Sequence, residues 1–285
     1  MPKDNASPGE ALTDVGSSGY TAAVSALVFA GTAGWSLPRT EQARFPDEGT
    51  HLERYSHLLR GTEINASFYR SLRPALYARW AAAVPAHFRF AVKVPKSVTH
   101  ERRLLDCEEP LAAFLDEVAA LGDKLGPLLV QLPPSLEYDA SLAGAFFEVL
   151  RALHDGAVAL EPRHATWFSM DASVQMAEYM VSRVAADPAR VPEAAVPGGS
   201  RALAYFRLHG SPRVYWSRYD DAWLAALAEQ VIEATRRSAE VWCIFDNTAS
   251  GAALPNALGL LEVLRSMSGS FPSGAEIQHV LPISD

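Results

Sequence analysis

Residues 203–210 read LAYFRLHG, a pattern typical of a buried strand, yet an arginine and a histidine stand two positions apart within it. Successive side chains of a strand point to opposite faces, so Arg207 and His209 share one face. Burial of such polar groups is costly unless they pair with each other or bind a ligand. We therefore predict that this face opens into an active-site mouth. The same spacing separates Glu63 from Asn65 and Glu161 from Arg163.

These residue types predict acid–base chemistry on a small anionic or sugar-like molecule. Glu63 or Glu161 would act as general base or acid, and His209 would carry a proton. Lys93 would hold the anionic group of the substrate or stabilise negative charge that develops during the reaction. Hydrolysis, isomerisation and elimination all remain open. We expect alanine at Glu63 or Lys93 to abolish turnover and to leave the melting temperature near that of the wild type.

Further polar and aromatic side chains occupy comparable positions along the chain and are candidates for substrate binding. The aromatic candidates could wall the pocket or simply pack the loops, and the histidine of KSVTHERRL could be a solvated loop residue. The predicted binding residues are Trp35, Asn65, Tyr69, His100, Gln131, Arg163, His164, Arg207, Asp246 and Asn247.

Three alternatives compete with this hypothesis. A closed salt-bridge network could fill the top of the fold without any function, because the acidic and basic candidates balance in charge. A non-catalytic protein could use the same mouth to capture an anion. A metal-dependent sugar isomerase or endonuclease could use Glu63, Glu161, His209 and Asp246 as ligands. The neighbouring cations would crowd a metal ion, so we predict no metal and no other cofactor.

Composition narrows the class of protein. The chain has 285 residues, is 49% hydrophobic and carries a net charge of −8, which disfavours non-specific binding to nucleic acid. Its cysteines, Cys107 and Cys243, show no metal-ligand spacing and suit a reducing cytoplasm. No apolar run is long enough to span a membrane. The expected partner is a small anionic substrate, and the oligomeric state is not predicted.

Eight short apolar runs alternate with amphipathic stretches and can position these side chains. They cover residues 27–35, 61–69, 88–95, 126–134, 157–164, 182–188, 203–210 and 241–247. Alternating strands and helices favour parallel pairing, and eight units close into an α/β barrel of the (β/α)₈, TIM type. The chemistry-bearing residues then meet at the C-terminal ends of the strands. Pro188, Pro192 and Pro197 predict that the sixth helix is short or missing.

A single barrel domain is expected over residues 25–270, with tails at 1–24 and 271–285. An open doubly wound sheet is the structural competitor, but GTAGWSLP after the first strand lacks a following helix pattern. No nicotinamide or flavin fingerprint, phosphate-binding P-loop or serine nucleophile elbow is found in the sequence.

Seven blocks of the sequence resemble the YecE-like proteins, the domain-of-unknown-function family 72. They are GTAGWS, TEINASFYR, FRFAVKVPKSVTHERRL, GPLLVQLPP, EPRHATWF, YFRLHG and DNTASGAALPNAL, which together span about residues 29–265. The resemblance implies a TIM-type barrel and does not imply a reaction. The family's motif positions are matched by Glu63, Asn65, Lys93, His100, Gln131, Arg163, His164, Arg207, His209, Gly210 and Asn247. Pro162 and Asp246 depart from the family's pattern, which puts a carboxylate role at the end of the eighth strand in doubt.

Overall fold

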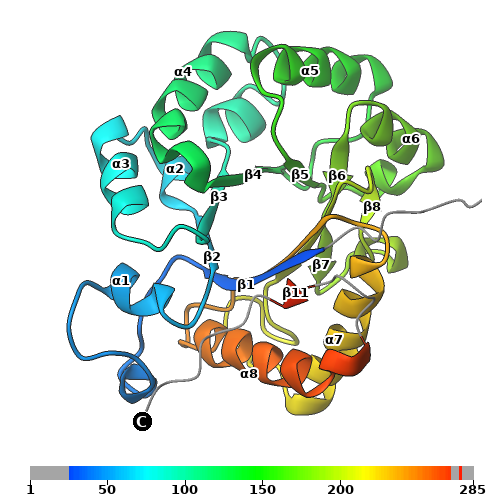
Figure 1. Ribbon diagram of the computed structural model, residues 1–285. Coiled ribbons are helices and arrows are strands. Elements are labelled where there is room, and N and C mark those ends of the chain that lie inside the picture. The colour runs from blue at the N-terminus through cyan, green and yellow to red at the C-terminus, as the bar shows by residue number, and fades with distance from the viewer. Residues whose placement is uncertain (1–25, 271–275, 278–285) are drawn as a thin grey trace, which may run out of the picture.

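A ring of parallel strands lies at the centre of the molecule and helices surround it (Figure 1). The computed structural model describes residues 26–270 and 276–277. The strands are β1 (Leu27–Ala33), β2 (Gly61–Ile64), β3 (Arg89–Lys93), β4 (Leu125–Gln131), β5 (Val158–Glu161), β6 (Val181–Arg183), β7 (Ala185–Asp187), β8 (Gly198–Gly199), β9 (Leu203–Leu208), β10 (Glu240–Phe245) and β11 (Glu276–Ile277).

Chain continuity between β6 and β7 closes the ring. β6 pairs in parallel with β5, and β7 pairs in parallel with β9. Only Val184 separates the two strands, and its amide still donates to the carbonyl of Leu160 at 2.9 Å. Two short strands lie outside the ring: β8 runs antiparallel to β6, and β11 pairs with β1. The predicted TIM-type barrel is confirmed.

The helices follow the strands in the expected alternation. They are α1 (His51–Ser56), α2 (Ala66–Tyr69), α3 (Pro74–Ala82), α4 (Glu108–Val118), α5 (Ala140–Leu153), α6 (Met170–Glu178), α7 (Asp221–Thr235) and α8 (Ala253–Ser266). Between β7 and β9 lie only the short helix Pro192–Ala195 and β8, so the prediction of a short or missing sixth helix is confirmed. The prolines of this link are poorly suited to a helix interior.

Two apolar layers hold the barrel together. The inner layer fills the ring, where Phe29 stacks on Trp242 at 4.5 Å between ring centroids and Tyr205 lies on the other side of that indole. The outer layer packs the strands against the surrounding helices. Gly31 is required where β1 approaches β2, because an added Cβ would lie 2.0 Å from the carbonyl oxygen of Gly61.

The predicted C-terminal boundary of the second strand, residues 61–69, is wrong. β2 stops at Ile64, and Asn65 already has helical dihedral angles (φ −94°, ψ −17°) as the residue that precedes α2. Tyr69 therefore lies on a short helix rather than on a strand. Asn65 and Tyr69 consequently do not continue the alternation that Glu63 begins.

The predicted N-terminal tail, residues 1–24, lies outside the described residues, as do 271–275 and 278–285. Within the predicted C-terminal tail, residues 276 and 277 form β11. No helix of the described ranges has the length and apolar character that crossing a membrane requires.

Candidate active site at the barrel mouth

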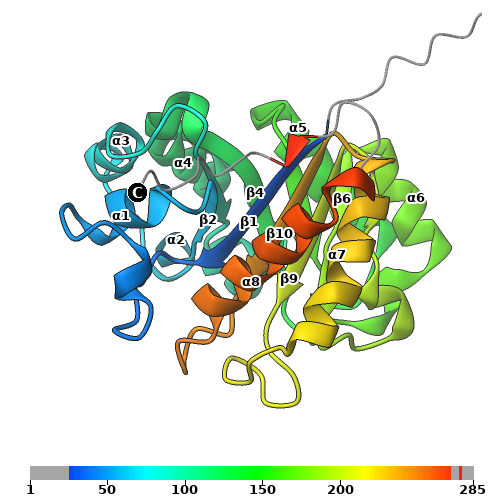
Figure 2. The ribbon, with the colours of Figure 1, turned by 60° about the horizontal axis from the view of Figure 1, so that its bottom comes forward.

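Parallel register brings the predicted polar residues to one end of the ring. Glu63 pairs with Ala33, and Glu161 pairs with Gln131, at the last steps of their ladders. The loops after β9 and β10, yellow and orange in Figure 2, extend beyond this same end. The residues on or directly after the C-terminal ends of strands are Glu63, Lys93, Gln131, Glu161, Arg207, His209 and Asp246.

Arg207 is the centre of the cluster, and it is 1% exposed. Its Nε and Nη2 atoms donate to Glu63 at 3.0 and 2.8 Å, and its Nη1 atom donates to Glu161 at 3.1 Å. Nη2 also lies 2.9 Å from Oδ2 of Asp246. Burial alone would oppose the charge, but these carboxylates raise the pKa of Arg207 well above its ordinary value. The guanidinium is therefore a fixed positive charge, and each of its three nitrogens contacts a carboxylate.

His209 lies between two carboxylates. Its Nδ1 atom is 3.1 Å from Oδ2 of Asp246, and its Nε2 atom is 2.9 Å from Oε1 of Glu161. Nη2 of Arg163 is also 2.9 Å from Nε2 and 2.6 Å from the same Glu161 oxygen. A doubly protonated imidazole can donate to both carboxylates, whereas a neutral one can accept from Arg163. The surroundings thus supply partners for both protonation states of His209.

The carboxylates beside His209 are held in their charged form. Burial tends to raise the pKa of Glu161, but Arg163, Arg207 and His209 outweigh burial and lower it. The pKa of Asp246 is likewise lowered, because Arg207 and His209 outweigh the effect of burial. Both groups are therefore hydrogen-bond acceptors at neutral pH rather than acids.

Tyr205 belongs to the cluster although the sequence reasoning missed it. Its hydroxyl donates to Oε2 of Glu63 at 2.9 Å, and the whole side chain is buried. Tyr205 is two positions before Arg207 on β9 and therefore shares its face. The spacing of two residues from Arg207 could have indicated that Tyr205 faces the cluster. An aromatic residue within an apolar run is, however, more typical of the hydrophobic core.

Lys93 differs from Arg163 and Arg207 because no carboxylate of the described residues contacts it. The side chain is 7% exposed, and its Nζ atom lies 4.0 Å from the ring centroid of Phe68. Within residues 26–270, no ion pair or hydrogen bond to Nζ is found. Burial and the nearby charge of Arg207 lower the pKa of Lys93 to about 8, although acidic groups of the cluster act in the opposite direction.

A cavity of about 400 Å³ opens beside the cluster at the ends of β1 and β2. Trp35 and Trp80 form one wall and meet edge to face at 5.0 Å between ring centroids. Glu63 and Asn65 also line this cavity, and Oδ1 of Asn65 is buried without a hydrogen-bond partner among the described residues. His51, which the sequence reasoning also missed, adds a titratable group from the first turn of α1.

The aromatic side chains near Lys93 form one contact group. The ring of Phe68 meets His100 and Tyr69, each at 5.0 Å between ring centroids. Nδ1 of His100 is 2.9 Å from Oγ1 of Thr99, while Tyr69 is 70% exposed. Burial, Lys93 and two arginines lower the pKa of His100. His100 therefore lies close to the cluster, and Tyr69 lies on its solvent side.

Two predicted residues make contacts outside the cluster. Nδ1 of His164 is 3.0 Å from Oγ1 of Thr166, and its Nε2 is 4.0 Å from Glu137. Nδ2 of Asn247 donates to the carbonyl of Ser217 at 2.8 Å and to Asn256. The amide of Asn247 thus ties the loop after β9 to α8. Gly210 begins that loop at a φ of +91°, which favours glycine.

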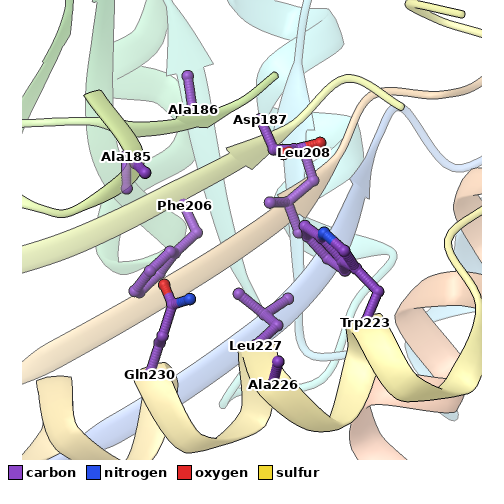
Figure 3. A pocket seen from close by; sticks show the side chains of 10 residues that line it. Ala185, Ala186, Asp187, Phe206, Leu208, Trp223, Ala226, Leu227 and Gln230 are labelled. Atoms are coloured by element: carbon purple, nitrogen blue, oxygen red, sulfur yellow. The ribbon is translucent and has the colours of Figure 1, made fainter. Parts of the chain in front are cut away.

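Cavities on the outer side of β9 are separate from the cluster. Figure 3 shows Phe206 and Leu208 pointing towards α7, which contributes Leu227 and Gln230 to a cavity of about 110 Å³. A larger groove of about 790 Å³ adjoins it along β8, β9 and α7. Arg207 lies between Phe206 and Leu208 in sequence and points inward, so these hollows lie behind the site.

The donor set does not favour the metal alternative. Oxygens of the predicted ligands Glu63, Glu161 and Asp246 contact Arg207. In the part of the chain that the structure describes, no three His, Cys, Asp or Glu side chains are placed to hold a metal ion.

Comparisons with known proteins agree with this fold. The UPF0759 protein YunF of Bacillus subtilis is 25% identical over 275 residues, which cover 84% of this chain and 95% of YunF. The UPF0759 protein YecE of Escherichia coli K12 is 27% identical over 107 residues, and this match spans only 38% of the length of YecE.

Solved structures show the same similarity. A DUF72 family protein of Enterococcus faecalis aligns with a TM-score of 0.70 at 26% identity, over 84% of this chain and 95% of that protein. A DUF72 family protein of Thermotoga maritima aligns with a TM-score of 0.69 at 25% identity, over 84% and 99% of the two chains. The family model described as "Protein of unknown function DUF72" matches residues 29–277, and the chain belongs to that family.

Proposed function

We propose that this protein is an enzyme that acts on a small anionic or sugar-like molecule at the C-terminal ends of the barrel strands. One observation carries the proposal: Lys93 is buried and has no ion-pair partner among the described residues, whereas every nitrogen of the neighbouring Arg207 guanidinium contacts a carboxylate. Catalytic groups of TIM barrels lie at this end of the strands.

A purely structural network gives a poor account of Lys93. Burial of an unpaired amine costs free energy, and a network that served only stability would place a carboxylate against it. The acidic groups of the cluster instead contact Arg207. Nε of Arg163 and Oδ1 of Asn65 are also buried without partners among the described residues. Buried polar atoms of this kind call for an unseen partner, and a bound ligand would supply one.

His209 would transfer the proton in this enzyme. The imidazole has acceptors on both nitrogens and a guanidinium beside Nε2, so both of its protonation states find partners. Glu161 and Asp246 would orient the ring and stabilise its cationic form. Glu63 would act mainly by fixing Arg207, because Arg207 and Tyr205 occupy its oxygens. Because both glutamates have other roles in this proposal, His209 is the proposed general base.

The cavity at β1 and β2 supports a sugar-like substrate. It offers two indole rings from Trp35 and Trp80 and polar groups from Glu63 and Asn65. Its volume of about 400 Å³ suits a small molecule. Lys93 and Arg163, each with limited exposure at the rim, would hold the anionic group.

A thermal-shift screen against phosphorylated sugars, organic acids and nucleotides tests this proposal. A ligand at 100 times its Kd stabilises the fold by about 2.7 kcal/mol, which corresponds to several degrees in Tm. We expect the hit to stabilise the wild type and the control variant Lys96→Met, but not Lys93→Met. Lys96 is a suitable control because it is half-exposed and pairs with Glu101 at 3.0 Å. Equal stabilisation of all three proteins would refute the assigned site.

A non-catalytic anion-binding protein is the second candidate. The observation in its favour is that Glu63, Glu161, Arg207 and His209 are at most 1% exposed. A ligand that stabilises the protein, and that remains chemically unchanged after prolonged incubation, would favour binding without catalysis.

A further inference from the structure

We infer that Lys93 is a covalent catalytic residue whose amine condenses with the carbonyl group of an aldehyde or ketone that also bears an anionic group. This inference rests on the proposed function and deepens it. An electrostatic lysine would only hold the substrate, whereas a condensing lysine would make a bond to it.

The backbone and stem of Lys93 are held firmly. Lys93 is the last residue of β3, and Oγ of Ser67 donates to its carbonyl oxygen at 2.6 Å. Its neighbours Val92 and Val94 are fully buried, and the ring of Phe68 lies against the amine. The side chain therefore loses little conformational entropy when it meets a substrate. A fixed geometry of this kind favours attack on a bound carbonyl group.

The amine is free to act as a nucleophile. Over the described residues it neither forms an ion pair nor donates a hydrogen bond. The aromatic ring contributes no lone pair that competes for the amine proton. A lysine that merely completed a network would show the opposite arrangement, with its amine bound to a carboxylate, as Lys96 is to Glu101.

Burial and one neighbouring cation favour the neutral, reactive form of Lys93. Burial and Arg207 lower its pKa to about 8. At pH 7.5 roughly a quarter of the Lys93 amines would then be uncharged, against roughly one in a thousand for a lysine of ordinary pKa. Desolvation and a neighbouring cation are two known ways to activate a lysine for attack on a carbonyl group.

The condensation balances without any further reactant. The lone pair of the neutral amine attacks the carbonyl carbon, the carbonyl π electrons move to oxygen, and one amine proton moves to that oxygen to give a carbinolamine. A second proton, taken from solvent, allows the C–O bond to break and water to leave. The product is an iminium ion with the same charge as the original ammonium group. The acidic groups that oppose the lowered pKa of Lys93 would stabilise this iminium.

The surroundings also suggest what else the substrate carries. Arg163 is partly exposed, and its Nε atom lacks a partner among the described residues. A guanidinium in this position suits a carboxylate or a phosphate group. The substrate class is therefore a 2-oxo acid or a phosphorylated ketose or aldose, and the experiment separates the two.

Reductive trapping tests the inference. The full-length protein is incubated at pH 7.5 with glyoxylate, pyruvate or dihydroxyacetone phosphate and with sodium cyanoborohydride, which reduces an iminium to a stable secondary amine. We expect one adduct per chain, whose mass equals that of the probe less one oxygen atom, and peptide mapping should place it on Lys93. Trapping by the oxo acids alone, or by the sugar phosphate alone, identifies the substrate class. No adduct on Lys93 with any probe, or equal labelling of Lys96, would overturn the inference.

Two variants separate this inference from the proposed function. Lys93→Arg keeps the positive charge but cannot form an iminium, and Lys93→Met removes both; circular dichroism checks that each folds. We expect neither variant to be labelled at position 93, while Lys93→Arg still gains thermal stability from inorganic phosphate. If the wild type is stabilised by phosphate but never labelled, the covalent role fails and the anion site stands. If the wild type is neither stabilised nor labelled, both proposals fail.

Discussion

Glu63 and Arg207 form a fully buried, bidentate ion pair between residues 144 positions apart in the chain, with Nε–Oε2 and Nη2–Oε1 distances of 3.0 and 2.8 Å. From the sequence we expected Glu63→Ala to leave the melting temperature near that of the wild type, and this ion pair changes that expectation. Glu63→Ala leaves the guanidinium short of a partner in a buried site, so we expect it to lower the free energy of unfolding by about 3 to 5 kcal/mol. Urea denaturation measures this loss. The control Glu101→Ala breaks an exposed pair with Lys96 and should cost at most about 1 kcal/mol. Equal effects of the two variants would contradict the assignment of Arg207 as the centre of the cluster.

Lys93→Met should stabilise the protein at pH 7, in contrast to the loss expected at Glu63. Methionine is close in shape to lysine and removes a buried amine whose pKa is lowered to about 8. We expect a gain of about 1 to 3 kcal/mol, smaller than the full pKa shift implies, because the site can relax. A loss of stability would instead mean that Lys93 has a structural partner.

The same amine gives the stability a characteristic alkaline pH dependence. Between pH 8 and pH 10.5 the unfolded state retains a proton on Lys93 that the folded state has released. Stability therefore rises with pH across this window through this group. The advantage of Lys93→Met should be largest below pH 8 and should vanish as pH approaches 10.5. An advantage that stays constant from pH 7 to pH 10.5 would show that it has another origin. Melting temperatures of both proteins measured in parallel buffers supply the test.

Acid should weaken the cluster through Asp246 and Glu161. Their folded-state pKa values are lowered, so the stability they contribute is present above their unfolded pKa and is lost as pH falls through the lower folded values. Asp246→Asn should destabilise the protein at pH 7, and the difference in Tm from the wild type should shrink from about pH 5 downwards. A difference that does not change with pH would show that Asp246 acts only through its shape.

The hydroxyl of Tyr205 should contribute through its buried hydrogen bond to Glu63. Tyr205→Phe removes a donor to a carboxylate that cannot be rehydrated, so we expect a cost of about 1 to 3 kcal/mol. Tyr179→Phe is the matched control, because its hydroxyl donates to Glu148 at 3.2 Å on the surface. That change should cost less than about 0.5 kcal/mol. Chemical denaturation of both variants compares the same hydrogen bond in a buried and in an exposed setting.

The sequence predicted the barrel because its main determinants are local. Apolar runs of strand length alternate with amphipathic stretches, and three prolines mark the missing sixth helix. Strand periodicity also placed Arg207 and His209 on one face, where the structure has them. The end of β2 was not predicted, because TEINASFY reads as a continuous strand although Asn65 turns the chain into α2.

The pattern of pairing could not be predicted from the sequence. Register places side chains at one end of the ring. Only three-dimensional geometry decides that Arg207 contacts carboxylates from the ends of three strands, and that no carboxylate of the described residues contacts Lys93. The contacts of His164 with Thr166, and of Asn247 with Ser217, likewise depend on the loops. The same loops determine how far the side chains of His164 and Asn247 are exposed to solvent.

The most direct test of the central claim is an NMR titration of Lys93. The chain has four lysines, so ¹³C-labelled lysine gives a simple spectrum in which Lys93→Met assigns the signal. An unpaired, buried amine that awaits an anionic ligand should titrate with a pKa of about 8, and this pKa should rise when phosphate or a carboxylate ligand is added. A pKa near 10.5 that no anion changes would mean that the Lys93 amine is solvated or already paired, and the account of the site would be wrong.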